Sequence, residues 1–239
     1  MTKEDAINFL AFSYFGVDIK CDVDNIDNAD EVIYAIIDRA YRDASSHVFS
    51  VTDDKDNKKK RAVNLIKDWI EKEKTDYQGV KDIWGELKKI YGEDISYGIA
   101  QKWINMATKY LAVLCLIMDE NSTFVKKYKS IEDTFYDDFH MPIDRYIMKA
   151  LSQEGYPVIP QKERKENEVQ IGKYSESGKK QSKAWSEWEE KDYNKFRKAL
   201  KESSFYEIGK SELDWEAEAW IKEAKKNKSY VKKYAPETN

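Results

Sequence analysis

Apolar side chains recur every three or four residues through most of this chain, and this spacing constrains its fold more than any other feature. In residues 96–118 they share one face, formed by Ile99, Trp103, Met106, Tyr110, Val113, Leu114 and Ile117. Such spacing places side chains on one side of an α-helix. Glycine and proline, which interrupt helices, number only nine and four among the 239 residues. We therefore expect an all-α fold, built as a compact multi-helix domain.

Similar spacing predicts further helices before and after this segment. A helix that begins after Thr2, with Asp5 in its first turn, should end at Gly16. The other predicted helices span residues 30–48, 58–74, 77–90, 144–152 and 182–201, with short helices within 122–136 and a last helix from Ser211. No alternating pattern long enough to predict a β-strand occurs.

Residues 155–183 interrupt the helical spacing and carry two of the four prolines, Pro157 and Pro160. A loop of this length is usually functional or a linker, and it could hold a short extended piece at residues 168–171. We therefore expect three parts. They are a helical core with a hairpin-like segment, residues 1–154, a long loop or linker, 155–183, and C-terminal helices that pack on the core, 184–239.

The net charge of −4 conceals an uneven distribution of charge. Residues 1–57 carry five Lys or Arg and thirteen Asp or Glu, a net charge of −8, so the remaining residues sum to +4. Residues 88–130 and 222–233 are locally positive. Contacts with phosphate groups need such positive surfaces, so the acidic overall balance does not exclude a nucleic-acid partner.

The chain offers few residues for a disulfide framework or a metal site. Its two cysteines, Cys21 and Cys115, are too few for either, and Cys115 lies in an apolar run typical of a buried helix. Only two histidines, His47 and His140, occur, and the acidic run 52–57 lacks the glycine and glutamate of a calcium loop. We expect no metal and no cofactor. Neither a membrane-spanning stretch nor a signal peptide is recognisable, which indicates a cytoplasmic protein.

Two charged residues in the central part of the chain could carry chemistry. Lys102 lies near the start of the helix predicted over 96–118, where the helix dipole and apolar neighbours would lower its pKa and favour a nucleophilic amine. Asp144 follows Pro142 at the start of the next helix, where its carboxylate can cap backbone N–H groups and stay ionised beside a pocket. The alternatives are an exposed lysine on a polar helix face and a simple helix cap.

The segments around these two residues resemble the core motifs of the helix-hairpin-helix DNA glycosylase superfamily, and they are most similar to its archaeal 8-oxoguanine branch. Residues 98–102, GIAQK, match the hairpin exit that leads into a helix with a catalytic lysine. Residues 142–147, PIDRYI, match the segment that carries an essential aspartate. The family's usual Leu-Pro-Gly-x-Gly turn is replaced by residues 93–98, EDISYG. The resemblance implies a glycosylase, with or without lyase activity, in which Lys102 attacks the sugar and Asp144 stabilises its positive charge.

The resemblance also implies a partner, double-stranded DNA with a damaged or modified base, and flipping of that base into a pocket. Candidate substrate-binding residues lie near the two motifs or in the C-terminal helices: Tyr97, Gln101, Trp103, His140, Trp185 and Trp188. Candidates for contacts with the DNA backbone are Gly98, Lys109, Lys126 and Lys127. Each aromatic residue could instead belong to the core, and each lysine to a solvated helix face. His140 could also act as a general acid or base near neutral pH.

Two other functions are consistent with the sequence. The acidic N-terminal third and the tryptophan-rich C-terminal helices favour a non-catalytic helical interaction protein, such as a component of a mobile element or of a defence system. A third hypothesis is a DNA-binding module that keeps the glycosylase fold without the chemistry. The sequence does not indicate an oligomeric state.

Overall fold

The chain is all-helical in the computed structural model, which describes residues 1–19, 26–45, 54–72, 76–156 and 184–226. No strand occurs within these ranges, so the predicted all-α class is confirmed. The α-helices are α1 (Lys3–Phe15), α2 (Ile26–Ser45), α3 (Lys55–Glu71), α4 (Trp84–Tyr91), α5 (Tyr97–Ile117), α6 (Thr123–Phe135), α7 (Arg145–Gln153), α8 (Glu190–Lys201) and α9 (Glu212–Lys226). The short 3-10 helices are η1 (Gly79–Asp82), η2 (Gly92–Asp94), η3 (Tyr136–Asp138), η4 (Trp185–Glu187) and η5 (Ser204–Ile208).

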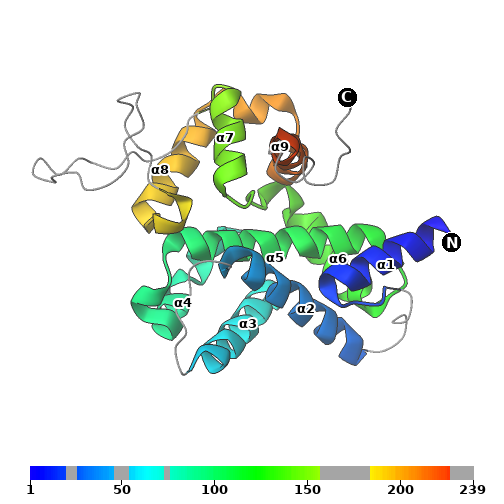
Figure 1. Cartoon of the computed structure of the whole chain (residues 1–239). Helices are drawn as coiled ribbons and strands as arrows, with labels where there is room; N and C mark the ends of the chain where they lie inside the picture. The colour runs from blue at the N-terminus through cyan, green and yellow to red at the C-terminus, as the bar shows by residue number, and fades with distance from the viewer. Residues whose placement is uncertain (20–25, 46–53, 73–75, 157–183, 227–239) are drawn as a thin grey trace, which may run out of the picture.

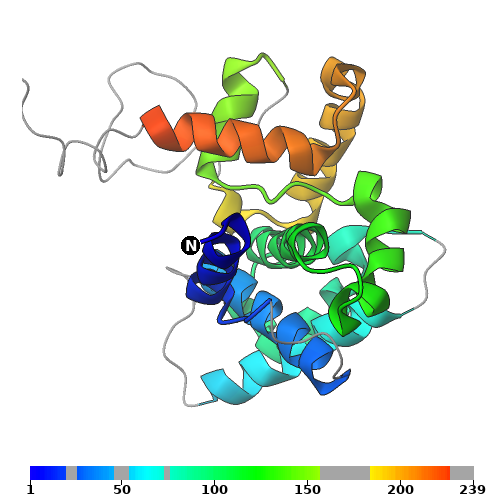
Figure 2. The ribbon, with the colours of Figure 1, turned by 90° about the vertical axis from the view of Figure 1, so that its right-hand side faces the viewer.

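The long helix α5 lies between two layers of shorter helices (Figure 1). One layer holds α2, α3 and α4, and the other holds α7, α8 and α9 on the opposite side of α5. Seen along α5, helices α1 and α6 lie on opposite sides of it (Figure 2). The buried core therefore surrounds α5, and residues of this helix can reach both layers.

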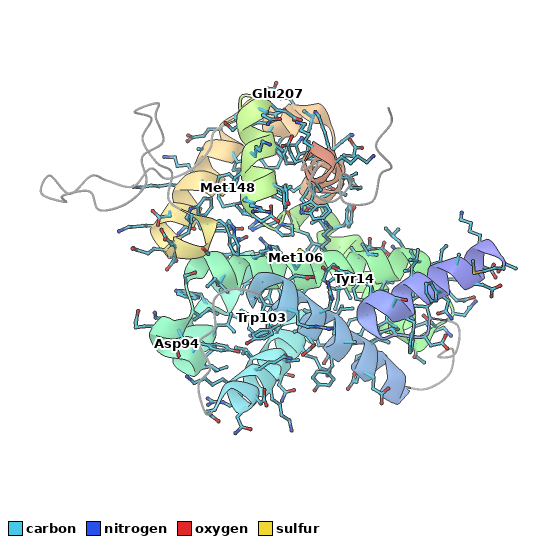
Figure 3. All side chains as sticks on the ribbon, in the orientation of Figure 1. Tyr14, Asp94, Trp103, Met106, Met148 and Glu207 are labelled. Atoms are coloured by element: carbon cyan, nitrogen blue, oxygen red, sulfur yellow. The ribbon has the colours of Figure 1, made fainter. Side chains whose placement is uncertain are left out.

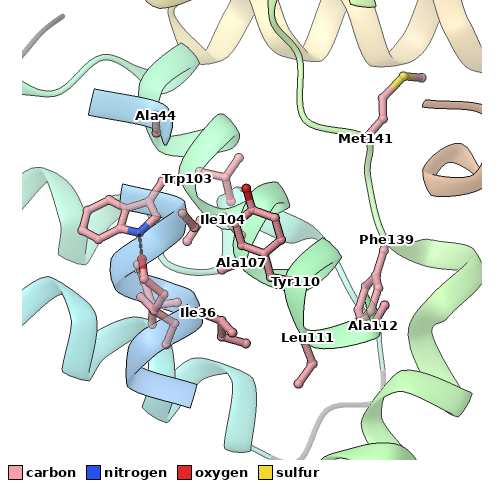
Figure 4. Packing of buried hydrophobic residues seen from close by; sticks show 14 of the residues in the cluster. Ile36, Ala44, Trp103, Ile104, Ala107, Tyr110, Leu111, Ala112, Phe139 and Met141 are labelled. Atoms are coloured by element: carbon pink, nitrogen blue, oxygen red, sulfur yellow. Dashed lines mark hydrogen bonds between the residues drawn. The ribbon is translucent and has the colours of Figure 1, made fainter. Parts of the chain in front are cut away.

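Helix α5 is central because apolar and small side chains cover most of its circumference, and a helix of this kind is stable when buried. Ser96 caps its N-terminus by accepting a hydrogen bond from the N–H of Ile99 at 3.1 Å. Trp103 is fully buried towards α2, where its indole N–H donates to the carbonyl of Ile37 at 3.0 Å (Figure 4, dashed line). Tyr41, one turn further along α2, packs edge-on against the same indole.

Several predicted helix boundaries differ from the structure. The helix expected over 77–90 is divided into η1 and α4 at Ile83, whose φ of −125° and ψ of 5° are not α-helical. Gly79, at the start of η1, has a positive φ of 63°, so an α-helix cannot continue through it. Helix α2 begins at Ile26, before the expected residue 30, and the short helices expected within 122–136 form the single helix α6 followed by η3. The extended piece proposed at 168–171 lies outside the described residues.

The helix expected over 182–201 begins only at Glu190. Glu189 and Asp192 form a capping box at this point, in which the N–H of Glu189 donates to Oδ2 of Asp192 at 3.0 Å. Trp185 and Trp188 therefore precede α8, in and beside η4, instead of lying on the helix. This placement brings both tryptophans over the N-terminal half of α5.

Helices α7 and α9 pack on each other in the second layer. The indole N–H of Trp215 on α9 donates to Oε2 of Glu154, just after α7, at 3.1 Å. Tyr156 packs edge-on against the rings of Phe205 on η5 and Trp215 on α9, so η5 packs together with α7 and α9. The division of the chain at residue 154 stays a prediction. Within the described ranges, no helix is long and apolar enough to cross a membrane.

Candidate functional site

A cavity of about 680 Å³ lies between α1, α5, α9 and the segment that precedes α7. Binding sites for small molecules usually have volumes of about 300–1,000 Å³. Figure 3 labels two of the lining residues, Tyr14 on α1 and Met106 on α5. The apolar and aromatic part of the wall is formed by Ile7, Leu10, Ala11, Tyr14, Phe15, Met106, Tyr110, Val113, Ile117, Pro142, Tyr146 and Trp220. The charged lining residues are Asp43, Lys102, Lys109, Asp144 and Glu216.

Lys102 and Asp144 meet on the wall of this cavity. The Nζ atom of Lys102 lies 3.6 Å from Oδ2 of Asp144, and the side chains are only 13% and 14% exposed. An ion pair that is largely withdrawn from water interacts more strongly than one on the surface, because the local dielectric constant is lower. The structure therefore brings together an amine and a carboxylate in a mostly apolar hollow.

Asp144 has two separate tasks, one for each carboxylate oxygen. Its Oδ1 atom accepts hydrogen bonds from the N–H groups of Tyr146, at 2.8 Å, and Ile147, at 3.1 Å. These bonds confirm the predicted N-cap of α7 and fix the rotation of the carboxylate. The Oδ2 atom is left to face Lys102.

Lys102 is the sixth residue of α5, which begins at Tyr97, and it therefore lies in the second turn of the helix. The helix dipole acts mainly within the first turn, so its effect on this ammonium group is smaller than expected. Its Nζ atom also lies 4.8 Å from the ring centre of Trp185, in a cation–π contact. Among the predicted substrate-binding residues, Trp185 is thus the one whose ring contacts the lysine.

A second lysine–carboxylate pair occupies the same cavity. Lys109 on α5 and Glu216 on α9 form an ion pair in which the glutamate side chain is 3% exposed. Burial raises the pKa of Glu216, and the positive charge of Lys109 opposes that rise. Lys109 follows Lys102 by two turns, or about 10 Å along the helix. The sequence predicts a contact of Lys109 with the DNA backbone, whereas its ion pair with Glu216 directs its side chain into the cavity.

Residues of α1 and α2 complete the other side of the cavity. The hydroxyl groups of Tyr14 and Tyr110 lie 2.6 Å apart, and both donate to Oδ2 of Asp43.

Trp220 on α9 is 40% exposed at the rim, and its ring packs edge-on against Tyr146. Sequence reasoning missed Glu216 and Trp220, although their spacing of one helical turn could have indicated a shared face.

Three of the predicted substrate-binding aromatic residues belong to the core instead. Tyr97, Trp103 and Trp188 are at most 1% exposed, and none of them lines the cavity. Trp103 lies in the core because the face of α5 that carries it is turned towards α2, away from Lys102. Trp188 packs against Phe196 of α8 and, with Trp185, covers the start of α5.

His140 does not line the cavity, and it is unsuited to acid–base chemistry at neutral pH. Its Nδ1 atom lies 3.0 Å from the hydroxyl of Tyr193. Burial and, to a smaller extent, the positive charge of Arg197 lower the pKa of His140 to about 3, although the negative charge of Glu212 opposes this shift. The imidazole is therefore neutral at pH 7, which corrects the expectation that it titrates there.

Gln101 is fully buried and contacts the backbone of Ile143, not an open space. Its amide nitrogen donates to the Ile143 carbonyl at 3.0 Å, and its amide oxygen accepts from the Ile143 N–H at 3.2 Å. Both ends of the side chain are thus occupied. Gln101 therefore does not line the cavity, and its role in substrate binding stays a prediction.

The predicted contacts with the DNA backbone are largely unavailable. The N–H of Gly98 donates to the Trp188 carbonyl at 3.0 Å, so it cannot bind a phosphate group. Lys127 pairs with Asp30 at 2.7 Å and with Glu71 at 2.8 Å. Lys126 is exposed on α6, and no ion pair is found for it within the described part of the chain.

Among the described residues, no three His, Cys, Asp or Glu side chains lie close enough together to hold a metal ion. The chemistry that the cavity offers is thus that of its two lysine–carboxylate pairs and its aromatic wall. In comparisons with known proteins, no protein-family model, no curated protein and no solved structure matches this chain.

Proposed function

We propose that this protein is a DNA base-excision glycosylase with lyase activity, which acts in the cytoplasm on double-stranded DNA that carries a damaged or modified base. One observation carries the proposal. Nζ of Lys102 and Oδ2 of Asp144 lie 3.6 Å apart on the wall of a cavity of about 680 Å³. These are the two residues that match the lysine and the aspartate of the helix-hairpin-helix motifs.

The cavity has the chemical character that a flipped base requires. A base in a duplex is inaccessible to side chains, so it must leave the stack, at a cost of a few kcal/mol. Stacking on aromatic side chains returns about 1–3 kcal/mol per base. Tyr146 and Trp220 provide such rings on the wall, and Lys109 and Glu216 provide hydrogen-bonding groups for the polar edge of a base.

The proposed reaction begins with cleavage of the bond between C1′ of the sugar and the base. The electron pair of that bond leaves with the base, and the positive charge that develops on the sugar is stabilised by the carboxylate of Asp144. Lys102 gives a proton to the departing base, and its free amine then forms a bond to C1′. A second proton then passes from this nitrogen to the ring oxygen O4′ as the C1′–O4′ bond breaks, and the nitrogen lone pair forms the C1′=N bond of a protonated Schiff base.

Borohydride trapping tests this proposal directly, because reduction of a Schiff base joins the enzyme to DNA irreversibly. We expect a trapped adduct with abasic DNA and with at least one damaged base, and no adduct for Lys102→Ala. Base release without a trapped adduct would support the glycosylase activity and contradict the lyase activity. Absence of both products across a panel of damaged bases that includes modified cytosines would overturn the proposal.

A specific observation favours a second candidate, a non-catalytic interaction protein. On α1, Phe9 and Phe12 are 66% and 59% exposed, which is unusual for aromatic side chains of a monomer. Under this alternative, a defined protein partner would bind with equal affinity to the wild type and to a variant with Lys102→Ala and Asp144→Asn. Salt-sensitive DNA binding without any product would instead indicate a DNA-binding module that lacks the chemistry.

A further inference from the structure

The carboxylate of Asp144 is carried by a short segment without regular structure, residues 139–144, which connects η3 to α7. Such a segment has no helix of its own to fix its position. Its place relative to α5 depends on the buried side chains of Phe139, Met141 and Ile143, on the cap at Asp144 and on the side chains that bind its backbone. Figure 4 shows this segment at Phe139 and Met141, beside α5.

Two side chains of α5, Gln101 and Asn105, hold this segment. Gln101 binds both backbone groups of Ile143, the residue before Asp144, with the bond lengths of 3.0 and 3.2 Å given above. One turn later, the amide nitrogen of Asn105 donates to the carbonyl of Met141 at 3.1 Å. Gln101 and Asn105 are both fully buried, so water does not compete for these bonds.

The orientation of the Gln101 amide is determined by its neighbours. Its oxygen accepts from the N–H of Ile143 and also from the amide nitrogen of Asn105, at 3.1 Å. A flipped amide would place its NH₂ group against both donors. Two bonds to a single residue restrict the rotation of the chain as well as its distance, as bidentate contacts do in general.

We propose that Gln101 is a positioning residue that sets the separation between Lys102 and Asp144. Gln101 directly precedes Lys102 in α5, and it binds the residue that directly precedes Asp144. The helix that carries the amine thus also determines where the carboxylate lies. This inference rests on the proposed glycosylase activity.

The role differs from general support of the fold, because the segment has another anchor. The N–H of Met141 donates to Oε2 of Glu212 at 3.0 Å, and Glu212 is paired with Arg197. Removal of the Gln101 amide should therefore leave the segment attached while Ile143 and Asp144 move. A displacement of about 1 Å in a catalytic group can reduce a rate about 100-fold.

The test compares Gln101→Met, which keeps the side-chain length without either hydrogen bond, with Thr108→Val as a matched control. Thr108 is a buried polar residue of the same helix, and its hydroxyl donates to the carbonyls of Ile104 and Asn105 and interacts with the hydroxyl of Tyr77, all of which lie outside residues 139–144. Trapping of abasic DNA is measured under single-turnover conditions over a range of DNA concentrations. This series gives the maximal trapping rate and the half-saturating DNA concentration as two separate quantities.

For Gln101→Met we expect the maximal rate to fall about 10- to 100-fold, with the half-saturating DNA concentration changed by less than about twofold. Thr108→Val should keep the wild-type maximal rate. If Gln101→Met does not fold, Gln101→Asn takes its place, since it keeps the amide on a stem that is one methylene shorter. If the Gln101 variant keeps the wild-type maximal rate, or if it and Thr108→Val lose the same amount, Gln101 is not a positioning residue. Either result would leave the proposed glycosylase activity standing. If the wild type forms no adduct and releases no base, both the proposed function and this inference are overturned.

Discussion

The Nζ atom of Lys102 lies 3.6 Å from the Oδ2 atom of Asp144, while Oδ1 of the same carboxylate accepts two backbone hydrogen bonds at the start of α7. One side chain thus serves both as a helix cap and as the partner of an amine. The two tasks use different oxygens, so the cap holds the carboxylate in the orientation that faces Lys102. Substitutions of Asp144 can therefore separate its effect on helix stability from its effect on the proposed reaction.

Asp144→Asn and Asp144→Ala should separate these two tasks. Both variants lose the ion pair with Lys102, and asparagine caps helices about as well as aspartate, so Asp144→Ala should be about 1 kcal/mol less stable than Asp144→Asn. Both variants remove the carboxylate that stabilises charge on the sugar, and both should slow base release about 100-fold or more. Urea denaturation and single-turnover base release measure the two effects. A fully active Asp144→Asn variant would show that the carboxylate does no chemistry.

Glu216→Gln should affect recognition of the base without affecting the abasic reaction. A hydrogen bond to a charged group contributes about 1.5–3 kcal/mol, so loss of the charge should slow release of a recognised base about 10- to 100-fold. Abasic DNA places no base in the cavity, and its trapping rate should change by less than about twofold. The ratio of the two rates is the measurement. Equal slowing of both reactions would mean that Glu216 supports the fold or the lysine instead.

The residues whose roles were predictable from sequence are those that act through local geometry. The face of α5 follows from spacing alone, and the N-cap of Asp144 follows from its place two residues after Pro142. Both depend on neighbours within one or two helical turns. Local patterns of this kind need no knowledge of the tertiary structure.

The roles that sequence reasoning missed all depend on contacts between distant segments. Lys109 pairs with Glu216, which is 107 residues away, and no local pattern connects them. Gln101 is a candidate for substrate binding through its place in the motif at residues 98–102, yet its partner, Ile143, is 42 residues away. The sequence places Trp188 on a helix face, but it lies before α8, and its carbonyl accepts a hydrogen bond from the N–H of Gly98, 90 residues earlier. Such pairings are determined by how the two layers pack on α5.

Gly98→Ala should destabilise the protein, in contrast to Gly85→Ala. A Cβ atom at residue 98 would lie 1.7 Å from the carbonyl oxygen of Trp185, so the segment over α5 would have to move. Overpacking of this kind usually costs about 1–3 kcal/mol. Gly85 is an exposed residue of α4 with no atom within 4 Å of a Cβ, and alanine there should stabilise the helix by about 0.5–1 kcal/mol. Urea denaturation of both variants checks these opposite signs.

His140 should make the protein less stable in acid. Its pKa of about 3 in the folded state is below the ordinary value of 6.5, because burial disfavours the charged imidazole. As the pH falls below about 6.5, the unfolded chain binds a proton at this residue and the folded chain does not, which favours unfolding. This one group should reduce the free energy of unfolding by up to about 1.4 kcal/mol per pH unit between the two pKa values.

His140→Gln isolates this contribution, because glutamine is polar and does not titrate. The variant is expected to lose some stability at pH 7, where the bond to Tyr193 is disturbed, and to lose less than the wild type between pH 7 and pH 5. The pKa of the neighbouring Glu212 is held below its ordinary value, mainly by Arg197, so Glu212 stays ionised over this pH range and the difference between the two slopes belongs to His140. Urea denaturation at pH 7, 6 and 5 measures it. Parallel slopes would mean that the imidazole takes up a proton in the folded state as readily as in the unfolded chain.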